Sequence, residues 1–149
     1  MYRIGIVGRG FVGSAVEFGF SDKTEYVLFI NDKDESKSVN SLEDVVSYSD
    51  FIFLSVPTPS NEDGSVNLNY VEDALQEISF LTSDIEQGAF SLDNIILIRS
   101  TIPPGTTRKL QQKYQNFKLS VSLTTRSPRS NEVEGVDYHF VSHQYFEEL

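Results

Sequence analysis

The stretch IGIVGRGFVG, residues 4–13, decides which fold to expect from this chain. The apolar run RIGIV, residues 3–7, is typical of a strand that is buried on both faces. The pattern G-x-G-x-x-G follows at once, through Gly8, Gly10 and Gly13. In a dinucleotide-binding loop these glycines permit a tight turn, a close approach of backbone to a pyrophosphate, and close helix-to-strand packing, in that order. A glycine turn without a ligand is equally compatible with the stretch taken alone.

The residues that follow favour the nucleotide-binding interpretation. FVGSAVEFGF, residues 11–20, predicts a short amphipathic helix with Phe11, Val12, Ala15, Val16 and Phe18 as its apolar side chains. EYVLFIND, residues 25–32, is a β-rich run that ends at Asp32. An acid about 20 residues after the glycines can accept hydrogen bonds from the adenosine ribose, which favours NAD over NADP. Lys33 and Lys37 weaken that preference slightly, and S-adenosylmethionine fits the same pattern.

The rest of the chain continues the alternation of strands and helices. Ser41, with Asp44 three residues later, predicts a helix start, and Asn67 or Asn69 predicts the start of a longer helix with Val71, Ala74, Leu75, Ile78, Leu81 and Ile85 on one face. Further strands are expected at FIFLSV (51–56), IILIRS (95–100) and KLSVSL (118–123), a turn at EQGAFSLDN (86–94), and a helix with prolines in its first turn within residues 101–114.

This order predicts a single α/β domain, a Rossmann-like, doubly wound and mainly parallel sheet. Residues 1–124 are expected to form an NAD-binding domain and residues 125–149 an irregular C-terminal extension with a short helix.

Composition narrows the function classes. The net charge of -10 argues against nucleic-acid binding, and the absence of cysteine excludes disulfides and Cys-ligated metals. No apolar run approaches the ~20 residues of a membrane-spanning helix, and the N-terminus lacks a signal-peptide pattern, so a cytoplasmic protein is expected. His139 and His143 are spaced to share a helix face, but no third ligand is evident; packing or exposed histidines are the preferred interpretation, and no metal is expected.

Three stretches together resemble the N-terminal domain of the UDP-glucose/GDP-mannose dehydrogenase family, the nucleotide-sugar dehydrogenases. They are the glycine loop with the acidic Asp32 to Asp34, the turn VPTP at residues 56–59, and STIPPGT at residues 100–106. The resemblance covers residues 2 to about 123. It implies NAD as cofactor, with Thr101 near the reacting carbon. The implied cofactor contacts are Gly8, Gly10, Phe11, Val12, Gly13, Asp32, Val56, Pro57, Thr58, Ser100 and Thr101.

The chain departs from the family after these motifs. Family members continue through N-P-E-F-L-x-E-G into a middle and a C-terminal domain, which supply a Lys, an Asn, an Asp and a nucleophilic Cys. Here Pro128 matches the family proline, Arg129 stands in place of the glutamate, and Glu132 or Glu134 is the available substitute. No cysteine is present to hold the aldehyde stage of a two-step oxidation.

Two functions therefore stay open. The first is the NAD-binding part of a nucleotide-sugar 6-dehydrogenase, incomplete for catalysis alone, with a partner chain that supplies the substrate domain. The second is a stand-alone, non-catalytic module that binds a dinucleotide or a nucleotide sugar.

Overall fold

The structure is a computed structural model that describes residues 1–86, 94–118 and 120–148. The chain divides into two compact units, Met1–Phe117 and Lys118–Leu149, and each is described by itself. Within the described residues, no helix is long and apolar enough to cross a membrane.

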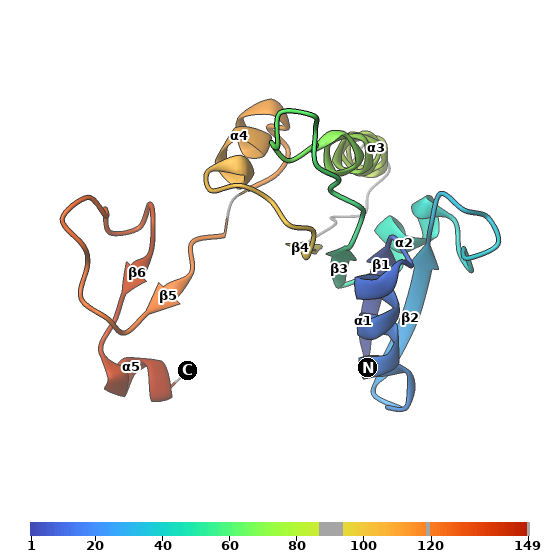
Figure 1. Cartoon of the computed structure of the whole chain (residues 1–149). Coiled ribbons are helices and arrows are strands. Elements are labelled where there is room, and N and C mark those ends of the chain that lie inside the picture. The colour runs from blue at the N-terminus through green and yellow to red at the C-terminus, as the bar shows by residue number, and fades with distance from the viewer. Residues whose placement is uncertain (87–93, 119, 149) are drawn as a thin grey trace. The chain divides into compact units, whose positions relative to one another are not determined.

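The first unit is built on a four-stranded parallel sheet in the order β2-β1-β3-β4 (Figure 1). The strands are β1 (Tyr2–Val7), β2 (Tyr26–Asn31), β3 (Phe51–Leu54) and β4 (Ile95–Ile98). β1 pairs with both β2 and β3, and β3 pairs with β4. Parallel neighbours need crossover connections, which α1 (Phe11–Ser21), α2 (Leu42–Tyr48) and α3 (Asn69–Glu86) supply. The expected Rossmann-like α/β class with a parallel sheet is confirmed.

Helices cover both faces of the sheet. Alternate residues of each strand point to opposite faces, so each face carries apolar side chains that a helix can bury. On one face, Ile4 and Ile6 of β1 pack with Val16 and Phe20 of α1. The other face carries the larger core, in which α2, α3 and α4 (Thr106–Lys113) pack on β1 and β3. Its buried members are Val7, Val45, Val46, Ile52, Leu54, Val71, Ala74, Leu75, Ile78, Leu110 and Tyr114.

Two helix starts follow the sequence closely. The Ser41 side chain accepts a hydrogen bond from the Asp44 backbone N–H, and the Asp44 carboxylate accepts one from the Ser41 N–H, so α2 begins with a complete capping box. α3 begins at Asn69, after Asn67, whose Oδ1 accepts a hydrogen bond from the Asn69 N–H. On the predicted inner face of α3, Val71, Ala74, Leu75 and Ile78 are buried and Leu81 is partly buried. The side chain of Ile85 lies outside the described part.

The helices α1 and α4 differ from what the sequence predicts. Phe11 and Phe18 were expected on the packed face of α1, but they are 94% and 78% exposed, and Phe20 packs against the sheet instead. The prolines expected in the first turn of α4 precede the helix, which starts at Thr106 after the left-handed Gly105. A positive φ at that glycine is what turns the chain into the helix.

The last predicted strand of the Rossmann sheet does not form as expected. Of KLSVSL, only Leu123 belongs to a strand, β5 (Leu123–Thr124), while position 119 lies outside the described residues. β5 pairs with β6 (His139–Phe140) in a separate two-stranded sheet. An apolar alternating run predicts a strand but not its partner, because pairing depends on distant residues. Of the turn expected at 86–94, residues 87–93 also lie outside the described part.

The second unit contains β5, β6 and α5 (His143–Glu147). The Arg126 side chain makes the central contacts of this unit. Its guanidinium donates hydrogen bonds to both carboxylate oxygens of Glu132. The same guanidinium lies 5.0 Å from the ring centre of Tyr138 and 5.8 Å from the ring centre of Phe140. Such a cation over aromatic rings stabilises a unit that is too small for a large apolar core.

The two histidines do not share a helix face. His139 lies in β6, with its Nδ1 3.1 Å from Glu134 Oε1, whereas His143 is the first residue of α5. Among the described residues, no group of three His, Cys, Asp or Glu side chains is arranged to hold a metal ion.

Candidate functional site

A cleft of about 550 Å³ opens at the carboxyl ends of the four parallel strands in the first unit. This is where ligands of open α/β sheets bind, because the strand order reverses there and the loops diverge. Its wall is formed by residues from five stretches of the chain, within 7–12, 31–42, 55–58, 70–77 and 99–101. Ten of the eleven residues expected to contact a cofactor line it: Gly8, Gly10, Phe11, Val12, Asp32, Val56, Pro57, Thr58, Ser100 and Thr101.

The eleventh expected residue, Gly13, supports the cleft from behind. A Cβ placed there would lie 1.9 Å from the carbonyl oxygen of Gly8, so the helix can approach the loop only with glycine at this position. Gly8 has φ of +93°, and its Cβ would meet the Ser55 carbonyl oxygen at 2.6 Å. Both glycines are therefore required by the fold of the loop itself.

Gly10 differs from the other two glycines. Its φ is -83°, and a Cβ there would have no heavy atom of the described structure within 4 Å. The fold alone would tolerate a larger residue at this position. The open space above Gly10 faces the cleft, as expected for a glycine that lets a pyrophosphate approach the backbone.

The N-terminus of α1 has the features of an anion-binding helix end. Of the residues described, no side chain caps this end, and its first turn holds no acid. The first backbone N–H groups of a helix lack partners within the helix and carry the positive end of its dipole. α2 shows the contrast, since Ser41 and Asp44 satisfy its first turn. The uncapped end of α1, beside the open Gly10, fits a pyrophosphate.

Asp32 stands at the end of β2, on the other side of the loop. Its Oδ2 accepts a hydrogen bond from the backbone N–H of Arg9 at 2.5 Å, and its Oδ1 accepts one from the N–H of Asp34 at 2.8 Å. These two bonds hold the carboxylate against the glycine loop. Each carboxylate oxygen has a further lone pair, with which Asp32 can accept hydrogen bonds from ribose hydroxyls.

Asp34 completes the acidic turn after β2 and also lines the cleft. Hydrogen bonds from the side chain and the backbone N–H of Ser36, and then the charge of Lys37, lower the pKa of Asp34 below its ordinary value. Asp34 is therefore ionised at neutral pH, and the 3.5 Å ion pair with Lys37 offsets its charge.

The two later loops are tied to each other at the base of the cleft. Ser100 Oγ donates to the carbonyl oxygen of Val56 at 2.8 Å, and the Arg99 N–H donates to the carbonyl oxygen of Leu54. These bonds hold the two loops together, and Thr58 of the VPTP turn and Thr101 both line the cleft. Both loops offer hydroxyl groups without charge to a ligand.

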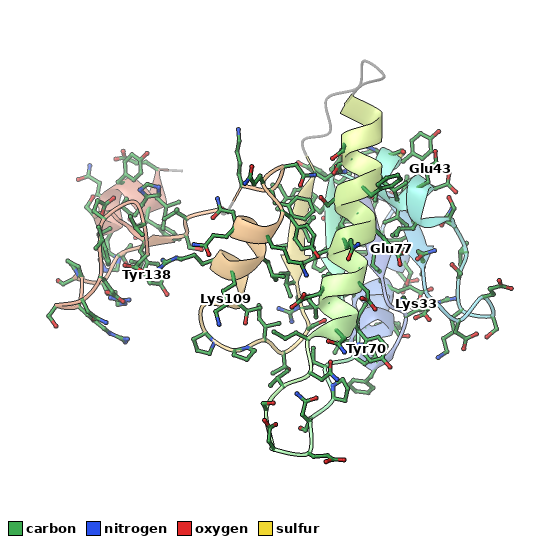
Figure 2. All side chains as sticks on the ribbon, turned by 90° about the horizontal axis from the view of Figure 1, so that it is seen from above. Lys33, Glu43, Tyr70, Glu77, Lys109 and Tyr138 are labelled. Atoms are coloured by element: carbon green, nitrogen blue, oxygen red, sulfur yellow. The ribbon has the colours of Figure 1, made fainter. Side chains whose placement is uncertain are left out.

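Several residues of the cleft were not recognised as site residues from the sequence. Ser55 lines it, with a hydroxyl that has no hydrogen-bond partner in the described part of the chain. Tyr70, Ala74 and Glu77 of α3 form part of the wall, and Figure 2 shows Tyr70 at the start of this helix and Glu77 further along it. Their i, i+4, i+7 spacing is a signal that the sequence contains, but it resembles that of any helix face.

The two glutamates considered as substitutes for the family glutamate lie in the second unit. Hydrogen bonds from Arg126 and from the Arg129 N–H lower the pKa of Glu132 to about 2. The Phe140 N–H and His139 lower the pKa of Glu134. Both carboxylates are therefore ionised and already engaged at neutral pH, which makes each a poor general base.

Comparison with known proteins decides the family. Residues 37–132 match the model of the UDP-glucose/GDP-mannose dehydrogenase family, NAD binding domain, which is more than half of the chain. The chain belongs to this family. The resemblance seen in the three sequence motifs is confirmed.

Solved structures share the fold. A UDP-glucose dehydrogenase from the hyperthermophilic archaeon Pyrobaculum islandicum matches with a TM-score of 0.62 and 21% identity, over 79% of this chain and 34% of that one. A GDP-mannose dehydrogenase from Pseudomonas aeruginosa, solved as a ternary complex, matches with a TM-score of 0.64 and 22% identity, over 76% of this chain and 33% of that one. This family member thus spans about a third of each dehydrogenase.

A second similarity points to a different class of protein. The guanylate kinase of Latilactobacillus sakei is 47% identical over 51 residues, which is 33% of this chain and 25% of the kinase. That of Mycolicibacterium paratuberculosis is 55% identical over 42 residues, or 28% of this chain and 19% of the kinase. The chain spans a quarter or less of these curated relatives. None of the motifs identified in the sequence indicated this similarity.

Proposed function

We propose that this chain binds NAD in the cleft of its first unit, as the cofactor-binding part of a nucleotide-sugar 6-dehydrogenase. The observation that carries the proposal is the convergence of the glycine loop, Asp32, the VPTP turn and the ST loop on one cleft. These segments are far apart in the sequence, so chance alignment of any one motif does not explain their meeting.

Each end of the cleft offers the chemistry that the dinucleotide needs. The open Gly10 and the uncapped start of α1 fit the pyrophosphate, and Asp32 fits the adenosine ribose. A 2′-phosphate would face that carboxylate, so NAD should bind more tightly than NADP. When bound, NAD accepts a hydride from an alcohol carbon. Thr101, at the far wall, is then placed to orient the substrate or a water.

Complete turnover requires residues that the described cleft does not supply. A hydride acceptor needs a general base and an oriented substrate beside it. We propose that a partner chain or further domain supplies these groups, with a nucleotide sugar as substrate. In the alternative of a stand-alone binding module, the cleft would hold the dinucleotide without turnover.

Calorimetric titration with NAD, NADP and S-adenosylmethionine tests the cofactor. We expect NAD to bind most tightly, and failure of all three to bind would refute the proposal. Addition of UDP-glucose or GDP-mannose, followed by NADH absorbance, separates the alternatives. Formation of NADH only with an added substrate domain would favour the split enzyme, whereas a stand-alone binding module should form no NADH under either condition.

The guanylate kinase similarity supports a second function, in the second unit. The dehydrogenase structure covers 79% of this chain, and the remaining fifth is close to the share of the 32 residues 118–149. We therefore assign the similarity chiefly to this unit and propose that it binds a guanine nucleotide. The ATP-binding pattern G-x-x-x-x-G-K-S/T does not occur in the 149 residues, so the proposal is limited to binding.

An isotope-labelled sample titrated with GMP tests this second function. Shifts confined to residues 120–148 are expected, with residues 1–86 unchanged, and NAD should give the converse pattern. Adenosine monophosphate serves as the control nucleotide for the second unit. Chemical-shift changes with GMP that are confined to the first unit would contradict guanine-nucleotide binding by the second unit. Equal changes with GMP and adenosine monophosphate would contradict it as well.

A further inference from the structure

We infer that one face of α3 forms an adenine slot in the cleft, in which Glu77 selects a purine with a 6-amino group. This inference rests on the proposed binding of NAD and names the residues that would recognise its base. None of the sequence motifs includes them.

The slot follows from the geometry of the helix. Tyr70, Ala74 and Glu77 all line the cleft. At 100° per residue these positions fall within about 60° of one another, and at 1.5 Å per residue they extend over about 10 Å. Ala74 is buried, with 4% of its surface exposed, and its small side chain leaves a shallow floor between the two longer ones. A flat bicyclic base has room on such a floor.

The opposite wall fits a base attached to a ribose. It is formed by Leu42 at the start of α2 and by the turn that carries Asp32 and Lys37. Leu42 provides the apolar contact that a purine face prefers, and Asp32 is the ribose acceptor described above. Tyr70 is half exposed at the end of the slot, and its ring can stack on the base. The adenosine half of the cofactor therefore lies between α3 and this turn.

The free carboxylate of Glu77 gives the slot its selectivity. Neighbouring acids of α3 are engaged, Asp73 with Lys33 at 3.6 Å and Glu72 with Lys113, whereas no hydrogen bond or ion pair holds Glu77 within the described ranges. Figure 2 shows Glu77 on α3. An ionised carboxylate only accepts hydrogen bonds. It therefore favours adenine, whose 6-amino group donates a hydrogen bond, over a purine that lacks this group.

Nicotinamide purine dinucleotide is the probe that tests this, because it differs from NAD only in replacing the 6-amino group by hydrogen. The wild-type chain should bind NAD about tenfold more tightly than the probe, the effect of one hydrogen bond to a charged group. Glu77→Gln offers the 6-amino group only an uncharged acceptor, so the ratio of the two dissociation constants should fall below about threefold. Glu62→Gln, at an exposed loop position outside the cleft wall, should keep the wild-type ratio.

Tyr70 provides an independent arm of the test. Tyr70→Ala should weaken both dinucleotides by about tenfold and leave their ratio unchanged, because stacking does not read the 6-substituent. Tyr70→Phe should bind both as the wild type does. Heteronuclear NMR spectra of all variants verify that each is folded.

The outcomes separate this inference from the proposed function. If the wild type binds NAD and the probe equally, or if Glu77→Gln keeps the wild-type ratio, the selection by Glu77 is refuted while NAD binding stands. If Tyr70→Ala binds NAD as tightly as the wild type, the base does not lie in this slot. If the wild type binds neither dinucleotide, the proposed function falls and the slot falls with it.

Discussion

At the scale of single residues, the three glycines of the loop have different physical tasks. Gly8 and Gly13 are required by the fold, since a Cβ at either would meet a backbone carbonyl oxygen within 2.6 Å. Gly10 has open space above it and a backbone conformation that any residue can adopt. Identical residues in one motif thus divide into two that hold the loop and one that leaves room for a ligand.

Gly10→Ala and Gly13→Ala form a matched pair that tests this division. Gly10→Ala should change the free energy of unfolding by less than about 0.5 kcal/mol, as exposed substitutions do, yet weaken NAD binding at least tenfold because its methyl group occupies the pyrophosphate position. Gly13→Ala should lower the free energy of unfolding by about 3 kcal/mol through overpacking. Urea denaturation and calorimetric titration measure both. Equal losses of stability in the two variants would contradict the assignment.

Asp32 is the residue that should set the choice of cofactor. Asp32→Asn keeps a side chain of the same size but removes the charge and one acceptor oxygen. Binding of NAD should weaken by about tenfold, the cost of a lost charge-assisted hydrogen bond, and the gap between NAD and NADP should narrow. Titration of both cofactors measures the two effects. Asp63→Asn, in a loop outside the cleft wall, is the control, and an unchanged NAD-to-NADP ratio in Asp32→Asn would refute the role.

At the scale of secondary-structure elements, the caps of the helices separate structural from functional ends. α2 is closed by its own capping box, whereas α1 begins at Gly10 with no side-chain cap among the described residues. The N–H groups of such an exposed helix end are hydrated until an anion replaces the water. The difference between two neighbouring helices indicates which one faces the ligand.

Ser41→Ala tests the structural cap. Loss of the hydroxyl leaves the Asp44 N–H without its acceptor, so the free energy of unfolding should fall by about 1 kcal/mol. NAD binding should not change. Ser14→Ala, at an exposed position within α1, should be neutral or slightly stabilising, because alanine is the better helix former. A loss as large in Ser14→Ala would show that the effect is not due to capping.

The Arg126–Glu132 pair makes the second unit sensitive to acid. The pKa of Glu132 is lowered from 4.5 to about 2 in the folded chain. A lowered folded pKa means that the pair contributes its full stability above pH 4.5 and loses it as the pH falls toward about 2. Carboxyl chemical shifts followed through an acid titration measure this directly. In Arg126→Gln the midpoint should return toward 4.5, and an unchanged midpoint would show that Arg126 is not the cause.

At the scale of the whole molecule, the chain divides into two compact units. The residues of the NAD cleft all belong to the first unit, Met1–Phe117. Ligand binding stabilises the part that binds, by RT ln(1 + [L]/Kd). The two units should therefore respond differently to the same ligand.

NAD at 100 times its Kd should raise the free energy of unfolding of the first unit by about 2.7 kcal/mol. Amide hydrogen exchange should slow in β1 and β3 but stay unchanged across residues 120–148. Equal protection of both units would contradict binding of NAD to the first unit alone. Nicotinamide alone, which lacks the pyrophosphate and the adenosine, is the control and should protect neither unit at the same concentration.

The sequence by itself determined the local features of this protein. Several features are recognisable from neighbouring residues alone. They are the alternation of strands and helices, the capping box at Ser41, the glycine motif and Asp32. Ten of eleven expected contacts accordingly lie in the cleft. The prediction for the packed face of α1 was wrong. Phe11 and Phe18 fit the helical period as well as the buried residues do, but both are exposed.

Only the tertiary structure decided which distant residues meet. Ser55 and Glu77 line the cleft because β3 and α3 pack beside β1 and β2, and nothing in their own neighbourhood marks them. Likewise, β5 pairs with β6 rather than with the large sheet, since the partner of a strand is chosen by long-range packing and not by its own alternation. Local chemistry is encoded by adjacent residues, whereas a binding site is a surface that exists only once separate segments have packed together.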